Sequence, residues 1–261
     1  MFLPETIRAL LPEAEYTLDD LGRSQAQVLL FEDRVLKIEK DCNASANELN
    51  MMRWLHGKLP VPEVLAADMV DDTRYLLMSR ITGNNLCADF ILNDQERLAD
   101  LVAKGLQQMW SVDITGCPTD RSLDAKFLEI ETGIRNGSIT MEQARQEETY
   151  GPSGFKSPAE LFDWLVKHRP QEELVLSHGD FCLPNILCNM HGLTGFIDLG
   201  CAGVADKWVD IEMVLWSMWA NSTGQFGGKK RDFDRQNLFA ALNMQPDEDK
   251  LRYYSLLNEL C

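Results

Sequence analysis

The sequence lacks the features of a membrane-spanning or disulfide-stabilised protein. No stretch approaches the ~18 consecutive apolar residues of a membrane helix, and the N-terminal residues carry glutamates early instead of the long apolar core of a secretory signal. The seven cysteines are an odd set without a C-x-x-C pair, so we expect neither a zinc site nor an ordered disulfide framework. Scattered cysteines suit a reducing compartment, and we therefore expect a cytoplasmic protein.

Positive charge is also scarce, with 25 basic against 41 acidic residues and a formal net charge of -16. Such a protein should repel nucleic acid and anionic membranes, and should attract cationic ligands. We therefore expect no nucleic-acid or membrane partner. Acidity alone is equally compatible with a cytosolic protein that is merely kept soluble by its charge.

Internal repeats and low-complexity segments are absent, and 261 residues suffice for one large domain or two modest ones. Strand patterns fill the first third and helical spacing dominates the rest, so the expected fold class is α+β, with one lobe over 1–80 and a second over 81–261. Two strands are expected within 26–40, on either side of a turn at Glu32 and Asp33, and two more within 59–83. A further pair is expected at 185–189 and 193–200. Expected helices cover 45–57, 94–112, 122–136, 158–168, 210–220 and 247–260.

The stretch "LSHGDFCLPNIL", residues 176–187, places Asp180 two residues after His178 and five before Asn185. One interpretation is a polar loop between strands, with turns marked by Gly179 and Pro184. The other is functional: Asp180 orients a nucleophile and Asn185 holds a metal ion. The stretch alone does not decide between them.

Three further charged residues extend the functional interpretation. Lys37 lies in an apolar strand, Glu48 lies on the following helix, and Asp198 ends the apolar strand of "GFIDLG". Alone, Lys37 and Glu48 could be exposed charges. Together they match phosphoryl transfer, in which the protein positions the phosphates and neutralises charge. Carboxylate and amide oxygens suit magnesium, and a second carboxylate can take the proton of the acceptor hydroxyl.

Resemblance to a known family sharpens this interpretation. "HGDFCLPN" and "IDLG" resemble the kinase signatures H-x-D-x-x-x-x-N and D-x-G. Longer segments such as "WLHGKLPVPEVL" and "GFIDLGCAGVADKWVDI" are similar to the aminoglycoside 3'-phosphotransferase family over nearly the whole chain. The resemblance implies a bilobal protein-kinase-like fold and transfer of the ATP γ-phosphate to a hydroxyl, expected to be the 3'-hydroxyl, of a cationic antibiotic. Open alternatives are a same-fold kinase of another hydroxylated metabolite and a nucleotide-binding pseudokinase.

The family's functional residues carry over motif by motif. Asp180 resembles the catalytic aspartate, and Asn185 and Asp198 resemble the Mg²⁺ ligands. The remaining matches are residues that the resemblance implies bind ATP, or GTP in its place. They are Lys37 and Glu48, which hold the phosphates, Ser24 in the loop over the β-phosphate, and the hinge backbone at Ser79 and Ile81. His178 is expected to brace the catalytic loop. We expect a monomer or a homodimer.

Departures from the family pattern cluster on the acceptor side. At positions where the family usually has basic or acidic residues, this chain has Cys201, Trp216, Ala220, Asn221 and Asn258. The expected acceptor contacts that remain are Glu147, Glu259 and the terminal Cys261. The tryptophans of the helix expected at 210–220, Trp216 and Trp219, either fill the core or reshape the cleft toward a more apolar acceptor.

Overall fold

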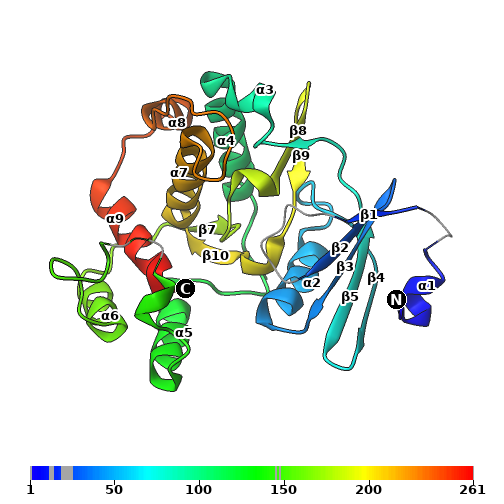
Figure 1. The fold of residues 1–261 in the computed structure, drawn as a ribbon, viewed down its shortest axis with the longest axis horizontal. Helices are drawn as coiled ribbons and strands as arrows, with labels where there is room; N and C mark the ends of the chain where they lie inside the picture. The colour runs from blue at the N-terminus through cyan, green and yellow to red at the C-terminus, as the bar shows by residue number, and fades with distance from the viewer. Residues whose placement is uncertain (1, 12–14, 19–25, 145, 147, 261) are drawn as a thin grey trace.

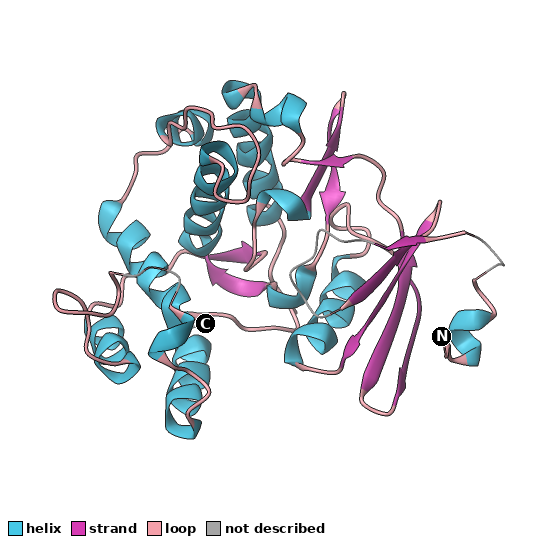
Figure 2. Ribbon diagram, viewed as in Figure 1, coloured by secondary structure: helices cyan, strands magenta, loops and turns pink. Residues whose placement is uncertain are grey.

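The computed structural model describes every residue except 1, 12–14, 19–25, 145, 147 and 261, and separates a strand-rich part from a helix-rich part (Figure 1). The strand-rich part is one antiparallel sheet of order β1-β2-β3-β5-β4. Its strands are β1 Thr17–Leu18, β2 Gln27–Leu30, β3 Arg34–Lys40, β4 Val64–Val70 and β5 Thr73–Ser79. The expected α+β, bilobal arrangement is confirmed, and Figure 2 shows the sheet on one side and most helices on the other.

The hairpin of β2 and β3 fixes which way Lys37 points. Phe31 closes the turn by donating its N–H to the Arg34 carbonyl at 2.9 Å, and the register pairs Lys37 with Val28 on one side and Leu76 on the other. Successive side chains of a strand point to opposite faces. Leu36 is therefore buried in a small core with Leu29 and Leu77, while Lys37 lies on the other face of the sheet.

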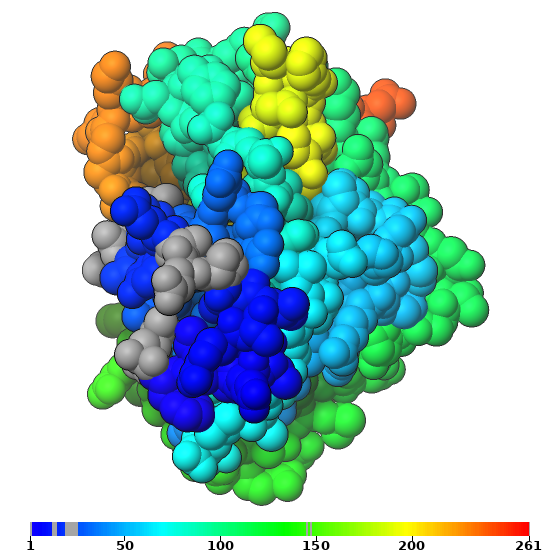
Figure 3. Space-filling model, turned by 90° about the vertical axis from the view of Figure 1, so that its right-hand side faces the viewer, coloured from blue at the N-terminus to red at the C-terminus, as the bar shows by residue number. Residues whose placement is uncertain are grey.

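That small core is covered by the N-terminal residues, which lie on the surface of the sheet in Figure 3. Helix α1, Glu5–Arg8, packs against β4 and buries Ile7 completely. The outer face of the sheet is thus occupied by α1. Helix α2 lies on its other side (Figure 1).

Helix α2, Asn43–Leu55, begins at a capping box formed by Cys42 and Ser45. Ser45 N–H donates to the Cys42 thiol, and the Cys42 N–H donates to the Ser45 hydroxyl at 2.9 Å, which satisfies two otherwise orphaned donors of the first turn. The helix buries Leu49, Met51 and Leu55 in the main core. Its register places Glu48 on the side that faces Lys37.

The helix-rich part surrounds two small sheets and the main apolar core, which contains Leu106, Phe196, Val214 and Tyr254 among others. One sheet pairs β7 Leu174–Ser177 with β10 Gly203–Asp206, and the other orders β6 Asn84–Asn85, β8 Ile186–Asn189 and β9 Gly192–Phe196 as β6-β8-β9. The helices are α3 Asp89–Leu92, α4 Gln95–Trp110, α5 Leu123–Asn136, α6 Pro158–Lys167, α7 Lys207–Thr223, α8 Gln236–Leu242 and α9 Glu248–Leu257. Short 3-10 turns are η1 Met141–Gln143, η2 Leu183–Asn185, η3 Leu199–Cys201 and η4 Asn258–Leu260.

The expected helices and the strands of the first sheet are present, with boundaries that shift by a few residues. Helix α7 begins at Lys207 and not at 210, because Asp206 caps it through the Trp208 N–H. The second strand of the 59–83 segment ends at Ser79, before Gly83. Strand β10 and helix α8 were not expected. Nowhere in the described chain is a helix both long and apolar enough to cross a membrane.

Candidate active site

Lys37 lies among three carboxylates where the sheet meets the helix-rich part. Its Nζ is 2.8 Å from Glu48 Oε2, 3.3 Å from Asp198 Oδ1 and 3.4 Å from Glu39 Oε1. Burial favours a lower pKa for Lys37, but the charges of Glu48, Asp198 and Glu39 together raise that pKa well above its ordinary value. Lys37 is therefore a permanently charged ammonium. Burial raises the pKa of Glu48, and the nearby Lys37 ammonium counteracts that rise.

Asp180 is held by donors on both of its carboxylate oxygens. Asn185 Nδ2 donates to Oδ2 at 3.0 Å and to the Asp180 carbonyl at 3.0 Å. The Cys182 thiol donates to Oδ1 at 3.0 Å. Asn185 is buried, whereas Asp180 is half-buried and lines a cavity. The carboxylate therefore has a fixed orientation toward open space.

The loop that carries Asp180 is anchored by Asp210, a residue that the sequence reasoning missed. Asp210 lies on α7, is fully buried, and accepts three hydrogen bonds of 3.0 Å from the Ser177 hydroxyl and the N–H groups of His178 and Gly179. Burial raises the pKa of Asp210, and the His178 ring and these three donors counteract the rise. An aspartate among apolar residues in "WVDIEMVL" was the available signal, because a buried carboxylate needs partners.

His178 braces the same loop from its side chain. The ring is buried, and its Nε2 lies 3.0 Å from the carbonyl oxygen of Ile197, the residue before Asp198. Gly179 adopts φ +74°, and a Cβ at this position would lie 2.2 Å from the Cys201 carbonyl oxygen. The catalytic loop and the Asp198 loop are therefore packed directly against each other.

Asp198 and Asn185 offer oxygen atoms of the kind that magnesium prefers. Asp198 has φ 60° and ψ 59°, and its side chain is 52% exposed. Asn185 turns its Nδ2 toward Asp180, which leaves its amide oxygen for other partners. The described residues hold no group of three His, Cys, Asp or Glu side chains with metal-binding geometry. A magnesium ion here would therefore take its remaining ligands from phosphate oxygens and water.

The hinge predicted at Ser79 and Ile81 begins at the last residue of β5. The Ser79 N–H donates to the Glu63 carbonyl at 2.9 Å, and the Glu63 N–H donates to the Ser79 hydroxyl at 2.8 Å. Neither bond uses the Ser79 carbonyl. The Ser79 N–H is thus engaged within the sheet, and the groups that suit an adenine edge are the Ser79 carbonyl and the Ile81 backbone.

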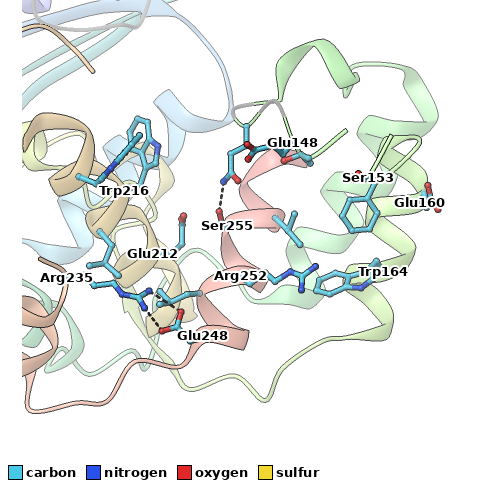
Figure 4. Close-up of a pocket in the computed structure, with 18 of the residues that line it drawn as sticks. Glu148, Ser153, Glu160, Trp164, Glu212, Trp216, Arg235, Glu248, Arg252 and Ser255 are labelled. Carbon is cyan, nitrogen blue, oxygen red and sulfur yellow. Dashed lines mark hydrogen bonds and ion pairs between the residues drawn. The ribbon is translucent and has the colours of Figure 1, made fainter. Parts of the chain in front are cut away.

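Two cavities lie beside α7 and α9. The smaller, about 310 Å³, contains Asp180, and Cys201, Met213 and Asn258 also line it. The larger, about 810 Å³, is lined by residues of the segment before α6, of α6 itself, and of α7 and α9 (Figure 4). Asp180 is not part of the larger cavity, but Asn258 Nδ2 donates to Glu212 Oε2 at 2.6 Å, and Glu212 lines the larger cavity. The two cavities therefore share a wall.

The larger cavity combines aromatic faces with charge. Trp164, Trp216 and Trp219 contribute to its lining, and Trp219 is 41% exposed. Its described lining includes four glutamates and two arginines, Arg235 and Arg252. Arg235 is paired with Glu248 at 2.6 Å, and the Arg252 guanidinium lies 5.6 Å from the centre of the Trp164 ring, as Figure 4 shows. The lining thus retains an excess of negative charge.

The acceptor-side departures occupy different surroundings. Cys201 is exposed, and Trp216 is half-buried and faces the larger cavity, whereas Ala220 is fully buried. Asn221 Nδ2 donates to the carbonyl of Ser217, one turn earlier on α7, at 2.8 Å. Of the two alternatives for Trp216 and Trp219, the structure favours the cleft, because both line the larger cavity. Trp208, earlier on α7, is buried in the core.

Glu259, an expected acceptor contact, is only 4% exposed and lies in η4. Its negative charge, together with burial, raises the pKa of Tyr150 to about 12, with burial the larger cause. The described lining of the two cavities does not include Glu259. Three other predicted site residues, Ser24, Glu147 and Cys261, lie outside the described residues.

Comparison with known proteins agrees with this geometry. Residues 17–254 match the model of the phosphotransferase enzyme family. The chain is 37% identical over 219 residues to an aminoglycoside 3'-phosphotransferase of Enterococcus faecalis, covering 82% of this chain and 77% of that protein. It is also 31% identical over 224 residues to a streptomycin 3''-kinase of Streptomyces griseus, covering 82% and 78%.

A solved structure extends the likeness to the fold. The crystal structure of an aminoglycoside-3'-phosphotransferase of type VIII superposes with a TM-score of 0.76 at 25% sequence identity, and the match covers 98% of each chain. The predicted resemblance is confirmed. The chain belongs to the phosphotransferase enzyme family, alongside the aminoglycoside 3'-phosphotransferases.

Proposed function

We propose that this protein transfers the γ-phosphoryl group of ATP to a hydroxyl, the 3'-hydroxyl, of an aminoglycoside, and so confers resistance to that antibiotic. The observation that carries the proposal is the cluster formed by Lys37, Glu48 and Asp198. Asn185 links this cluster to Asp180, because its amide donates to the Asp180 carboxylate and its backbone carbonyl accepts from the N–H of Ile197, the residue before Asp198. Residues more than a hundred positions apart along the chain meet there. A nucleotide-binding pseudokinase would not need such a complete set.

Each residue has a role that its surroundings support. Lys37, fixed by Glu48, binds the nonbridging phosphate oxygens of ATP, and the backbone at Ser79 and Ile81 receives the base. We assign Ser24 to the loop over the β-phosphate. Asn185 and Asp198 hold Mg²⁺, which supplies neutralisation of phosphate charge when bound.

Asp180 orients the acceptor hydroxyl and accepts its proton. The hydroxyl oxygen forms a bond to the γ-phosphorus as the bond from that phosphorus to the β,γ-bridging oxygen breaks, and ADP departs. The half-buried Asp180 lines the smaller cavity, so the reacting ring of the acceptor lies there. We place the other rings of the acceptor in the larger cavity, where carboxylates suit ammonium groups and tryptophan faces suit the apolar faces of sugars. Glu147, Glu259 and Cys261 remain candidate acceptor contacts.

A second candidate is phosphorylation of a 3''-hydroxyl. It rests on the similarity to the streptomycin 3''-kinase, which is 31% identical to this chain, against 37% for the 3'-enzyme of Enterococcus faecalis. It is also favoured by Trp216 and Trp219, whose aromatic faces line the larger cavity. We further propose a cytoplasmic location and a hinge at the boundary of 1–80 and 81–261. The protein is a monomer or a homodimer that uses ATP, with GTP as an alternative donor.

The test is a coupled ADP-release screen of the purified protein with Mg²⁺. The panel contains kanamycin, neomycin, a 3'-deoxy analogue of each scaffold, streptomycin and simple hydroxylated metabolites. Turnover that disappears with the 3'-deoxy analogues supports the 3'-assignment, and turnover of streptomycin alone supports the 3''-assignment. Absence of turnover on every aminoglycoside would overturn the proposal.

A further inference from the structure

The chain places a thiol directly against its catalytic carboxylate. Cys182 Sγ is 3.0 Å from Asp180 Oδ1, two residues along the chain, and donates to that oxygen. The contact arises because the chain turns sharply after Asp180: Cys182 N–H donates to the Asp180 carbonyl at 2.8 Å. Cys182 is half-buried and immediately precedes the turn η2.

The two tethers of Asp180 differ in kind. On Oδ2 the donor is the Asn185 amide, which is buried and also bonded to the Asp180 carbonyl. On Oδ1 the donor is the Cys182 thiol. A carboxylate rotates about one terminal torsion with a broad energy profile. A donor to one carboxylate oxygen still allows rotation about this torsion, whereas a donor to each oxygen restricts it.

We propose that Cys182 is a positioning residue for phosphoryl transfer, acting through Asp180. Its thiol keeps Asp180 in one orientation. In that orientation the remaining lone pairs of the carboxylate can accept a hydrogen bond from the hydroxyl of the acceptor substrate. Because a thiol is a weak donor, it fixes the orientation without competing strongly for the charge that must take the proton. The inference rests on the phosphotransferase activity proposed above.

This role makes Cys182 different from the other thiols. Cys117 donates to a backbone carbonyl, that of Thr119, at 3.6 Å, and Cys42 caps α2. Cys87 is half-buried between β6 and α3, and burial raises its pKa to about 12. Removing the Cys87 thiol deletes a sulfur of similar burial far from Asp180 along the chain, so Cys87→Ala is the matched control.

The experiment compares Cys182→Ala, Cys182→Ser and Cys87→Ala with the wild type. We measure kcat, KM for ATP, KM for the acceptor, and Tm. Cys182→Ala should lower kcat about tenfold, within the cost of a misplaced reacting group, with both KM values within about twofold. Cys182→Ser keeps a donor and should recover most of kcat. Cys87→Ala should match the wild type.

The outcomes separate cleanly. Wild-type kcat in Cys182→Ala, or Cys182→Ser as impaired as Cys182→Ala, overturns the positioning role. Should Cys182→Ala be too unstable to assay, Cys182→Val retains volume without a donor and must show the same loss of kcat, or the role is overturned. A wild type that turns over no acceptor refutes the proposed function instead, and that result is recognised before any variant is made.

Discussion

The proposed nucleotide side and the proposed acceptor side of the reaction centre are held together by different contacts. On the nucleotide side, Lys37 touches Glu48 and Asp198 through charge-assisted contacts of 2.8 and 3.3 Å, and buried Asp210 fixes the catalytic loop with three bonds. On the acceptor side, the contacts are more varied: the Asn258 amide donates to the Glu212 carboxylate, Trp216 packs against Phe226, and an exposed ion pair joins Arg235 and Glu248.

The difference has a chemical reason. The nucleotide donor of a kinase always carries the same triphosphate, so the groups that bind it must have fixed charge and fixed geometry. The acceptor varies in ring number and charge, and aromatic faces tolerate that variation better than paired charges do. Substitutions on the nucleotide side should therefore change turnover strongly, and those on the acceptor side should change apparent affinity modestly.

The largest effect should come from Asp180→Ala. Loss of the proton acceptor should lower kcat by at least ~10², while the Kd for ATP stays near the wild-type value because Lys37, Glu48 and Asp198 are untouched. Isothermal titration with a nonhydrolysable ATP analogue measures the binding, and steady-state kinetics measure the turnover. Unchanged turnover would remove Asp180 from the catalytic role.

Asp198→Ala and Asn185→Ala should rank next and should differ from each other. Each removes one of the two proposed oxygen ligands, so the Mg²⁺ concentration for half-maximal rate should rise, by about tenfold or more for the carboxylate. Asn185→Ala also frees Asp180 Oδ2. It should therefore retain a lowered kcat at saturating Mg²⁺, whereas excess Mg²⁺ should restore more of the rate to Asp198→Ala. Magnesium titrations that overlay the wild type in both variants would refute this metal site.

Glu48→Gln should have a smaller effect, confined to nucleotide binding. The carboxylate 2.8 Å from Lys37 Nζ becomes a neutral amide, and KM for ATP should rise about tenfold, the value of one charge-assisted hydrogen bond. The raised pKa of Lys37 means that its charge is complete below its ordinary pKa and is lost only well above it. The wild-type KM for ATP should thus be equal at about pH 6.5 and 8.5. Glu39→Gln, which removes the longer 3.4 Å contact, is the control and should change KM less.

The nucleotide side was also the more predictable from sequence, for a physical reason. Lys37, Asp180 and Asp198 lie in short motifs whose local pattern indicates a strand, a turn and a strand end. The predicted strand end lies too late in the chain, because β9 ends at Phe196 and Asp198 adopts a left-handed backbone conformation before η3. The pairing of Lys37 with Glu48 was inferred from a helix packed on the sheet, and the structure brings the two together.

Contacts that depend on packing between distant segments have no comparable local pattern in the sequence. Asp210 meets His178 from 32 residues away, and Asn47 of α2 donates to the Gly200 carbonyl from 153 residues away. Trp208, Trp216 and Trp219 occupy one helix and look alike in sequence, yet the first is buried in the core and the others line a cavity. Only the placement of α9 and the segment before α6 separates them.

The smallest effect, and the sharpest test of the acceptor side, should come from Asn258→Asp. Asn258 donates to Glu212 at 2.6 Å across the wall between the two cavities. The substitution replaces a donor by a second carboxylate, and like charges at this distance repel each other. Tm should fall. An acceptor with several ammonium groups relieves the repulsion on binding, so its KM should fall about threefold, the scale of one partly exposed ion pair, with kcat unchanged. High salt should reduce the fall in KM because it screens such ion pairs.

Asn258→Ala is the control, because it breaks the same hydrogen bond without adding charge and should not lower KM. A KM that is equal for all three proteins at low and high salt would show that this wall does not contact a cationic acceptor.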